Sequence, residues 1–138
     1  MKAFYKLSFL LWATLFLVSC EKDDDTQIQL PIISDLEIGQ DNNKIGYVGE
    51  DLHIEATIFA AEKIKTVEIS IHHEDNQNGW NFNQIYSEFE NLKNTEFHEH
   101  IDIPLNALRG KYHLHFKVTD QKGNATEEEA FLEIREAP

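Results

Sequence analysis

Residues 96–120 read Glu-Phe-His-Glu-His-Ile-Asp-Ile-Pro-Leu-Asn-Ala-Leu-Arg-Gly-Lys-Tyr-His-Leu-His-Phe-Lys-Val-Thr-Asp. Polar and apolar residues alternate in two runs of this stretch, and a loop separates the runs. Such alternation is typical of half-buried β-strands. Each run carries a His-x-His pair, His98 with His100 and His113 with His115. Side chains two residues apart in a strand leave the same face about 6–7 Å apart, so each pair offers two nearby imidazoles.

The alternation also predicts which side chains face outward. In the first run, residues 96–103, the apolar residues share the inner face with Glu99 as an exception. The outward residues are His98, His100 and Asp102. The second run begins at Gly110 and buries its aromatic and aliphatic residues. Its outward residues are His113, His115 and Lys117.

The rest of the domain repeats this pattern. Alternating runs predict further strands near residues 30–38, 52–59, 65–73 and 130–134, with a short irregular strand between residues 80 and 89. Turn residues separate the runs, notably at Asp41–Gly46 and Asp120–Asn124. Seven antiparallel strands at this spacing predict an all-β, two-sheet sandwich.

The amino terminus predicts export and a lipid anchor. Residues 1–19 have the basic start and short apolar run of a signal peptide. Leu17-Val18-Ser19-Cys20 resembles the lipobox of bacterial lipoproteins, which implies that Cys20, the only cysteine, is lipidated. The alternative is an ordinary signal peptide with an incidental cysteine.

Residues 20–28 form an acidic segment with almost no apolar side chains, which predicts a tether between the anchor and a domain at residues 29–138. Lys22 followed by acidic residues resembles the surface-export signal of Bacteroidota lipoproteins, and simple solubility is the other reading. The expected location is the outer membrane, at the cell surface or else facing the periplasm.

The charge balance narrows the range of partners. The chain has 12 basic and 25 acidic residues, and removal of Lys2 and Lys6 with the signal leaves a formal net charge of about −15. A surface of this sign repels nucleic acid and attracts cations. We therefore expect no nucleic-acid partner.

Three short motifs carry a family resemblance: Ile101-Asp102-Ile103-Pro104, Gly110-Lys111-Tyr112-His113, and Val118-Thr119-Asp120 with Gly123-Asn124. They resemble the last three strands of bacterial immunoglobulin-like domains, with Tyr112 at the place of a tyrosine corner. Together with Ile71-His72, they are similar to a family of Bacteroidota lipoproteins of unknown function. The resemblance implies an immunoglobulin-like β-sandwich without implying an activity. Members often carry a His-rich segment after the third strand, and this chain has only His72-His73-Glu74 there.

In an immunoglobulin-like sandwich the third and sixth strands pair antiparallel. This pairing predicts a metal site on one outer face, formed by His72, Glu74, His113 and His115. Neutral imidazoles suit zinc or copper, and carboxylates complete such sites. The alternative is that histidines on an acidic surface only shield charge or respond to pH.

Pairing of the second and fifth strands predicts a secondary cluster on the opposite sheet. Its members are His53, His98, His100 and Asp102, with Glu55 nearby. The two clusters should lie on opposite faces and remain separate. His73 is expected to point inward at the edge of the core.

The sequence gives no support for catalysis. Cys20 is assigned to lipid, and neither a His-Glu-x-x-His helix nor a Gly-rich phosphate loop is present. We expect a binding protein that captures metal or hands it to a transport or outer-membrane receptor protein. The second hypothesis is an adhesion or glycan-binding and protein-binding module that uses Trp80, Phe82 and Tyr86, although these rings are also suited to capping the core.

Overall fold

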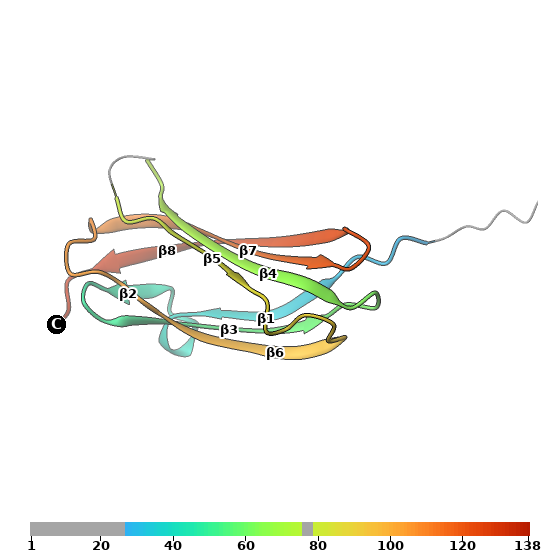
Figure 1. Ribbon diagram of the computed structural model, residues 1–138. Coiled ribbons are helices and arrows are strands. Elements are labelled where there is room, and N and C mark those ends of the chain that lie inside the picture. The colour runs from blue at the N-terminus through green and yellow to red at the C-terminus, as the bar shows by residue number, and fades with distance from the viewer. Residues whose placement is uncertain (1–26, 76–78) are drawn as a thin grey trace, which may run out of the picture.

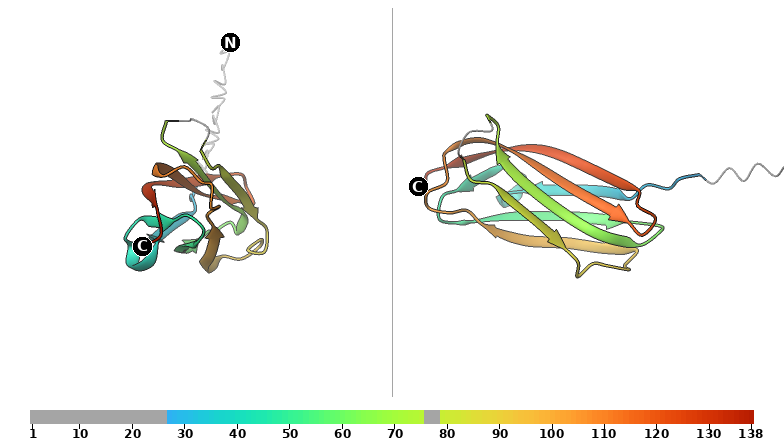
Figure 2. Two further views of the ribbon diagram at one scale, coloured as in Figure 1. Left: turned by 90° about the vertical axis from the view of Figure 1, so that its left-hand side faces the viewer. Right: turned by 45° about the horizontal axis from the view of Figure 1, so that its top comes forward.

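The computed structural model describes residues 27–75 and 79–138, so the predicted signal peptide and Cys20 lie outside the described residues. The described chain forms two β-sheets packed face to face (Figures 1 and 2). The three-stranded sheet has the order β1 (Ile32–Ile38), β3 (Asp51–Phe59), β6 (Asn94–Asp102). The five-stranded sheet has the order β2 (Ile45–Tyr47), β8 (Ala125–Arg135), β7 (Gly110–Asp120), β4 (Ile64–His73), β5 (Phe82–Tyr86). This arrangement confirms the predicted immunoglobulin-like sandwich. No helix in the two described ranges is long and apolar enough to cross a membrane.

The predicted turn at Asp41–Gly46 is wrong in part. A short 3₁₀ helix, η1 (Gln40–Asn42), leads into β2, which pairs parallel to β8 with Gly46 opposite Ile134. The described chain therefore has eight strands and one parallel pair. Gly46 makes this close approach feasible, because a Cβ atom there would lie 2.5 Å from Ile103 and 2.9 Å from Ile134.

The last strand begins five residues earlier than the sequence predicted, at Ala125 rather than Ala130. Buried Asp120 fixes the preceding hairpin by accepting hydrogen bonds from the backbone N–H groups of Lys122 and Asn124, at 2.9 and 2.8 Å. Burial acts to raise the pKa of Asp120, but the hydrogen bonds from Asn124 and Lys122 outweigh it and lower the pKa. The fixed turn sets the β7–β8 register, which places Glu129 opposite His115.

The inward rows of the two sheets form one core. Phe97 of the three-stranded sheet meets Phe116 of the five-stranded sheet edge to face, with ring centroids 5.0 Å apart. The Tyr112 hydroxyl donates a hydrogen bond to the backbone oxygen of Leu108 at 2.7 Å. This contact confirms the tyrosine corner that the family resemblance implied. Burial raises the pKa of Tyr112, so the hydroxyl stays a donor at neutral pH.

The amino-terminal segment of the described chain enters the sandwich at one of its two ends. Thr126, just after the hairpin, donates a hydrogen bond to the backbone oxygen of Pro31 at 2.5 Å, so the chain enters the sandwich beside that hairpin. The same end lies where the blue segment enters in Figure 1. His113 precedes Thr119 by six positions on β7, or about 20 Å along the strand. The outward histidines of β7 therefore lie toward the end opposite the one where the chain enters the sandwich.

Candidate metal centres

Three histidines gather on the outer face of the five-stranded sheet. His72 on β4 lies directly opposite His113 on β7, and His115 follows on the same face opposite Ser70. All three are half-buried, and each offers a nitrogen within 4.8 Å of those of the other two. The structure thus brings together three of the four residues predicted for this site. We call this group, with the carboxylates described below, the β4–β7–β8 site.

Two of these imidazoles face each other through nitrogens that both carry lone pairs. The Nε2 atoms of His72 and His115 are 3.2 Å apart. His72 Nδ1 lies 3.2 Å from the backbone oxygen of His73, and His115 Nδ1 lies 2.6 Å from Oε1 of Glu127. Both of these partners accept hydrogen bonds, so the tautomer that satisfies them carries the proton on Nδ1 and leaves a lone pair on each Nε2. In that tautomer the two lone pairs face each other, and a metal ion bound to both would remove their repulsion.

One ring nitrogen of the third imidazole, His113, lacks a hydrogen-bond partner among the described residues. His113 stacks on Phe131 with ring centroids 4.7 Å apart and planes 8° apart, which fixes its orientation. Its Nε2 is buried and makes no hydrogen bond to any described residue. Oε2 of Glu129 is 3.2 Å away, within ion-pair distance but outside hydrogen-bonding geometry. A buried polar nitrogen without a partner is costly, so this atom is suited to a ligand from outside the chain.

The carboxylates of the site come from β8, which the sequence analysis missed. His115, Glu127 and Glu129 form a second ligand group, with one atom of each within 4.8 Å of the others. Nothing in the alternation marks Glu127 and Glu129, because they belong to an unbroken acidic run. The usable signal was the hairpin turn, whose register places Glu129 opposite His115.

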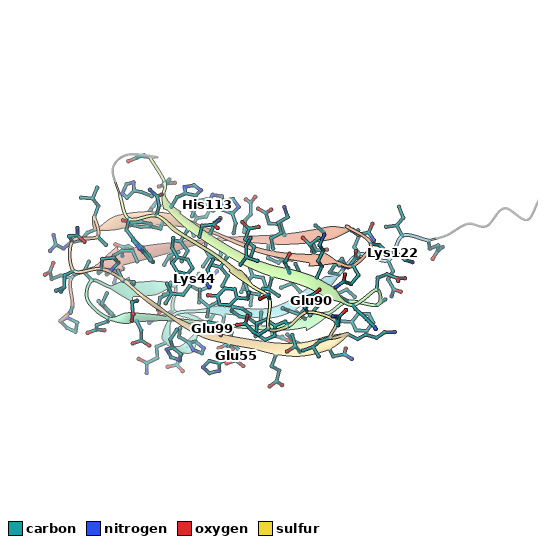
Figure 3. All side chains as sticks on the ribbon, in the orientation of Figure 1. Lys44, Glu55, Glu90, Glu99, His113 and Lys122 are labelled. Atoms are coloured by element: carbon teal, nitrogen blue, oxygen red, sulfur yellow. The ribbon has the colours of Figure 1, made fainter. Side chains whose placement is uncertain are left out.

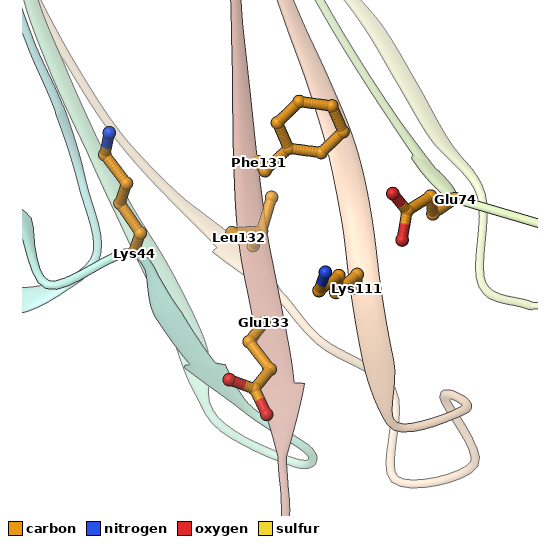
Figure 4. A pocket seen from close by; sticks show the side chains of 6 residues that line it. All are labelled: Lys44, Glu74, Lys111, Phe131, Leu132 and Glu133. Carbon is orange, nitrogen blue, oxygen red and sulfur yellow. The ribbon is translucent and has the colours of Figure 1, made fainter.

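The structure does not bring Glu74 together with the three histidines predicted for the same site. Glu74 belongs to none of the ligand groups found among the described residues. It follows the end of β4 and lines a surface pocket of about 380 Å³ together with Lys111 and Phe131 (Figure 4). The backbone N–H of Glu74 still donates to the Lys111 oxygen at 2.9 Å, so the ladder with β7 continues past His73. Glu74 therefore lies beside Lys111, on the side of His113 that faces away from His115.

Solvent reaches the β4–β7–β8 site from one side. His115 and Glu127 line a shallow pocket of about 210 Å³ with Ser70 and Lys117. An ion can therefore enter without unfolding of the sheet. The walls of this pocket are polar, as expected for a site that exchanges a charged ligand.

A second group of histidines lies on the outer face of the three-stranded sheet. His53 on β3 is paired with His100 on β6, and Glu55 is paired with His98. Figure 3 shows the two regions on opposite sides of the sandwich, with His113 above and Glu55 below. The pairing and the separation of the clusters agree with the sequence analysis. We call this group the β3–β6 cluster.

Asp102 does not take the place predicted for it in the β3–β6 cluster. It faces outward as expected, but its register partner is Asp51, and it belongs to no ligand group. The carboxylate that contacts His100 Nδ1 is that of Asp51. This hydrogen bond is the main reason why the pKa of Asp51 is lowered. The alternation predicts a strand that begins only at Leu52, so it does not indicate Asp51 as a member of the cluster.

The aromatic residues considered for ligand binding pack mainly onto the core. Tyr86 is 6% exposed and lies opposite the inward-facing Val67, so its predicted role as an exposed ring is wrong. Burial raises the pKa of Tyr86 to about 12. Trp80 and Phe82 are half-buried against the core. The other reading of these rings, as a cap on the sandwich, agrees with this packing.

Comparisons with known proteins support the fold. The profile of a family described as "Domain of unknown function (DUF4625)" matches residues 18–135. No curated protein matches the chain. The chain is similar to the solved structure of the "GspB Siglec domain", with 18% identity and a TM-score of 0.54 over 80% of this chain and 60% of that one.

It is also similar to Spo0M, a sporulation control protein from Bacillus subtilis. That match has 11% identity and a TM-score of 0.52, and it covers 80% of this chain and 51% of that one. The chain therefore spans less than two thirds of either solved structure. At these identities the likeness concerns the fold alone.

Proposed function

The chain belongs to the DUF4625 family of domains of unknown function, and from its histidine geometry we propose that it binds a transition metal ion, zinc or copper, at the β4–β7–β8 site. The ligands in this proposal are His72, His113 and His115, with Glu127 and Glu129 in supporting positions. The protein would capture the ion or hand it over, and it would not catalyse a reaction. This role keeps the expectation drawn from the sequence.

The main support is the pair of facing lone pairs on His72 and His115. Two nitrogens bound to one tetrahedral zinc ion at about 2.0–2.1 Å are themselves about 3.3 Å apart. The observed separation of the two Nε2 atoms is 3.2 Å. The strands therefore hold these nitrogens at the spacing that an ion requires, before any ion is bound.

The carboxylate of Glu127 adds a second kind of support. Histidines that bind metals commonly donate their other ring N–H to a carboxylate, which fixes the tautomer and strengthens the ligand. The contact of 2.6 Å between His115 Nδ1 and Glu127 Oε1 has this form. Glu129 lies near both His113 and His115, at 3.2 and 3.7 Å, where its carboxylate can balance the charge of the ion.

We further propose that the domain is held at the outer membrane through lipid on Cys20 and presents the site away from that membrane. The chain enters the sandwich beside the β7–β8 hairpin, and the β4–β7–β8 site lies toward the other end. A site displayed in this way suits transfer to or from a transport or receptor protein. The strongly acidic surface would concentrate cations around it.

Zinc titration by calorimetry at pH 7.4, repeated near pH 5, tests the proposal. We expect binding at neutral pH and its loss near pH 5, because a protonated imidazole has no lone pair for a metal. The variant His72→Gln/His115→Gln should lose this binding, and Lys65→Gln, at the opposite end of β4 from His72, should retain it. Absent binding at neutral pH, or binding that is unchanged near pH 5, would contradict the metal role.

A second candidate function is adhesion or binding of glycan or protein at the cell surface. The observation in its favour is that Trp80 and Phe82 stay half-buried at the edge strand β5, with ring centroids 6.1 Å apart. The likeness to a Siglec domain fits a binding module, but it concerns the fold alone. If this candidate is right, Trp80→Ala should abolish retention on a glycan array while zinc binding stays intact.

A further inference from the structure

The β3–β6 cluster repeats the plan of the first site on the opposite sheet. His53 and His100 are paired across the ladder, and His98 lies two residues from His100 on the same face. Each of the three offers a nitrogen within 4.8 Å of those of the other two. We propose that His53, His98 and His100 form a second, independent site for a divalent transition metal, open to solvent and therefore able to exchange its ion. This inference does not depend on the first site binding metal.

The spacing of the nitrogens is again that of a shared ion. The Nε2 atoms of His98 and His100 are 3.2 Å apart. The Asp51 carboxylate contacts His100 Nδ1, so the proton of the neutral ring lies on Nδ1 and the lone pair lies on Nε2. The lone pair of His100 therefore lies on the nitrogen that is 3.2 Å from His98 Nε2, close to the separation of about 3.3 Å between two nitrogens bound to one tetrahedral zinc ion.

His53 supplies the third imidazole from the neighbouring strand. Its ring centroid lies 4.9 Å from that of His98 and 5.3 Å from that of His100. Oε2 of Glu55 is 3.6 Å from His53 Nε2 and equally far from His98 Nδ1. These distances exceed a good N–H···O hydrogen bond, so the carboxylate balances charge without occupying the ring nitrogens.

A cavity beside the cluster shows where the open side of the ion would lie. It has a volume of about 530 Å³ and is lined by His53 and His100 together with oxygen-bearing side chains around η1 and the start of β3. Those oxygen-bearing side chains include Glu37, Asp41, Glu50 and Asp51. A negatively charged hollow next to three imidazoles attracts a hydrated cation. It also leaves room for water, or for a donor from another molecule, to complete the coordination.

Metal stoichiometry tests the second site. The purified chain is equilibrated with ZnCl₂, freed of unbound metal by rapid gel filtration and analysed by elemental mass spectrometry. In parallel, zinc binding is followed through the shifts of the histidine ring carbons and nitrogens in NMR spectra. We expect two zinc ions per chain, with His98 and His100 shifting as one group and His72 and His115 as another.

Paired variants separate this proposal from the proposed function. His98→Gln/His100→Gln should remove one equivalent and leave the shifts of His72 and His115 unchanged. His72→Gln/His115→Gln should remove the other and leave those of His98 and His100 unchanged. Glu96→Gln, on the same face of β6, is the control and should retain both equivalents.

The results that would overturn the second site are specific to it. If His98 and His100 show no zinc-dependent shift, or if their replacement leaves stoichiometry and affinity unaltered, the β3–β6 cluster is not a metal site. The first site is tested by the His72 and His115 replacements and shares no ligand with the second, so either site can fail without the other. Circular dichroism of each variant confirms that the sandwich is folded, which makes a lost equivalent attributable to lost ligands.

Discussion

The two histidine groups have the same arrangement on opposite sheets, but their side chains differ in how far they are buried. In both, a histidine on one strand meets two histidines spaced i, i+2 on its neighbour, and a carboxylate contacts the Nδ1 of one of the pair. The side chains of His113 and His115 are 19% and 23% exposed, whereas those of His98 and His100 are 56% and 51% exposed.

The position of the strand in its sheet explains this difference. β7 is an interior strand between β4 and β8, so its outward row is flanked on both sides, and Phe131 of β8 covers His113. β6 is the edge strand of the three-stranded sheet and has a neighbour on one side only. Ligands that are already held in place lose less conformational freedom on binding. We therefore expect the β4–β7–β8 site to bind metal more tightly than the β3–β6 cluster.

The largest expected effect concerns the stabilisation of the fold by zinc. At a free zinc concentration 100 times the Kd, binding stabilises a folded protein by about 2.7 kcal/mol. His115→Gln should abolish most of the zinc-induced rise in Tm, and His100→Gln should abolish little of it, as measured by differential scanning calorimetry. Lys65→Gln, at the opposite end of β4 from His72, serves as the control. Equal losses in the two histidine variants would break the proposed ranking of the sites.

Replacing the carboxylates that contact the histidines should also affect the β4–β7–β8 site more than the β3–β6 cluster, although each effect should be smaller than that of losing a histidine. Glu127→Gln should weaken zinc binding at its own site about 10- to 100-fold, the usual cost of losing a carboxylate that orients a metal-binding histidine. Asp51→Asn should cost less at the β3–β6 cluster, because its carboxylate and His100 are both about half exposed. Competition with a chromogenic zinc chelator measures both effects. Glu128→Gln, which removes one charge from the other face of β8, should leave both affinities unchanged.

Acid titration should distinguish the stability that Asp120 gives to the β7–β8 hairpin from any effect of the histidines. The pKa of Asp120 is lowered in the folded state, so its contribution is present above the unfolded pKa, near 3.9, and is lost as pH falls through the folded value. With metal removed, Asp120→Asn should cost about 1–2 kcal/mol of unfolding free energy at pH 7. This difference should persist at pH 5 and shrink below about pH 4. Urea unfolding between pH 7 and pH 2.5 measures it, and a difference that already disappears near pH 6 would contradict the assignment.

The smallest expected effect concerns the tyrosine corner. It tests whether the free energy of unfolding can change while zinc affinity stays the same. Tyr112→Phe removes the hydrogen bond to Leu108 and should cost about 0.5–1.5 kcal/mol of unfolding free energy. Because Tyr112 faces the core while His113 faces outward, zinc affinity should stay the same at both sites. Urea unfolding and zinc titration of the same variant give the two values. A loss of affinity confined to the β4–β7–β8 site would show that the tyrosine corner also positions His113.

Alternation made the strands predictable, because a residue's face in a strand follows from its position along the chain. The inward rows, the outward histidines of both clusters and the pairing of β4 with β7 followed from that rule and from the family resemblance. The same rule gives the face of a residue but not its distance from a chosen neighbour, which is why Glu74 was expected too close to His115: it lies beside Lys111 instead. It also cannot assign faces within an unbroken polar run, where no apolar residues mark the inner face, and for this reason Glu127 was missed.

The sequence by itself determined a β-sandwich with imidazoles on its two outer faces, because alternate residues of a strand face opposite sides of the sheet. Tertiary structure alone decided which carboxylates meet those imidazoles and how deeply each group is covered. Those features depend on register and on whether a strand is flanked by two neighbours or one. Both are set by turns such as the one around Asp120 and by the packing of Gly46 against the core, which bring together residues that are far apart in the chain.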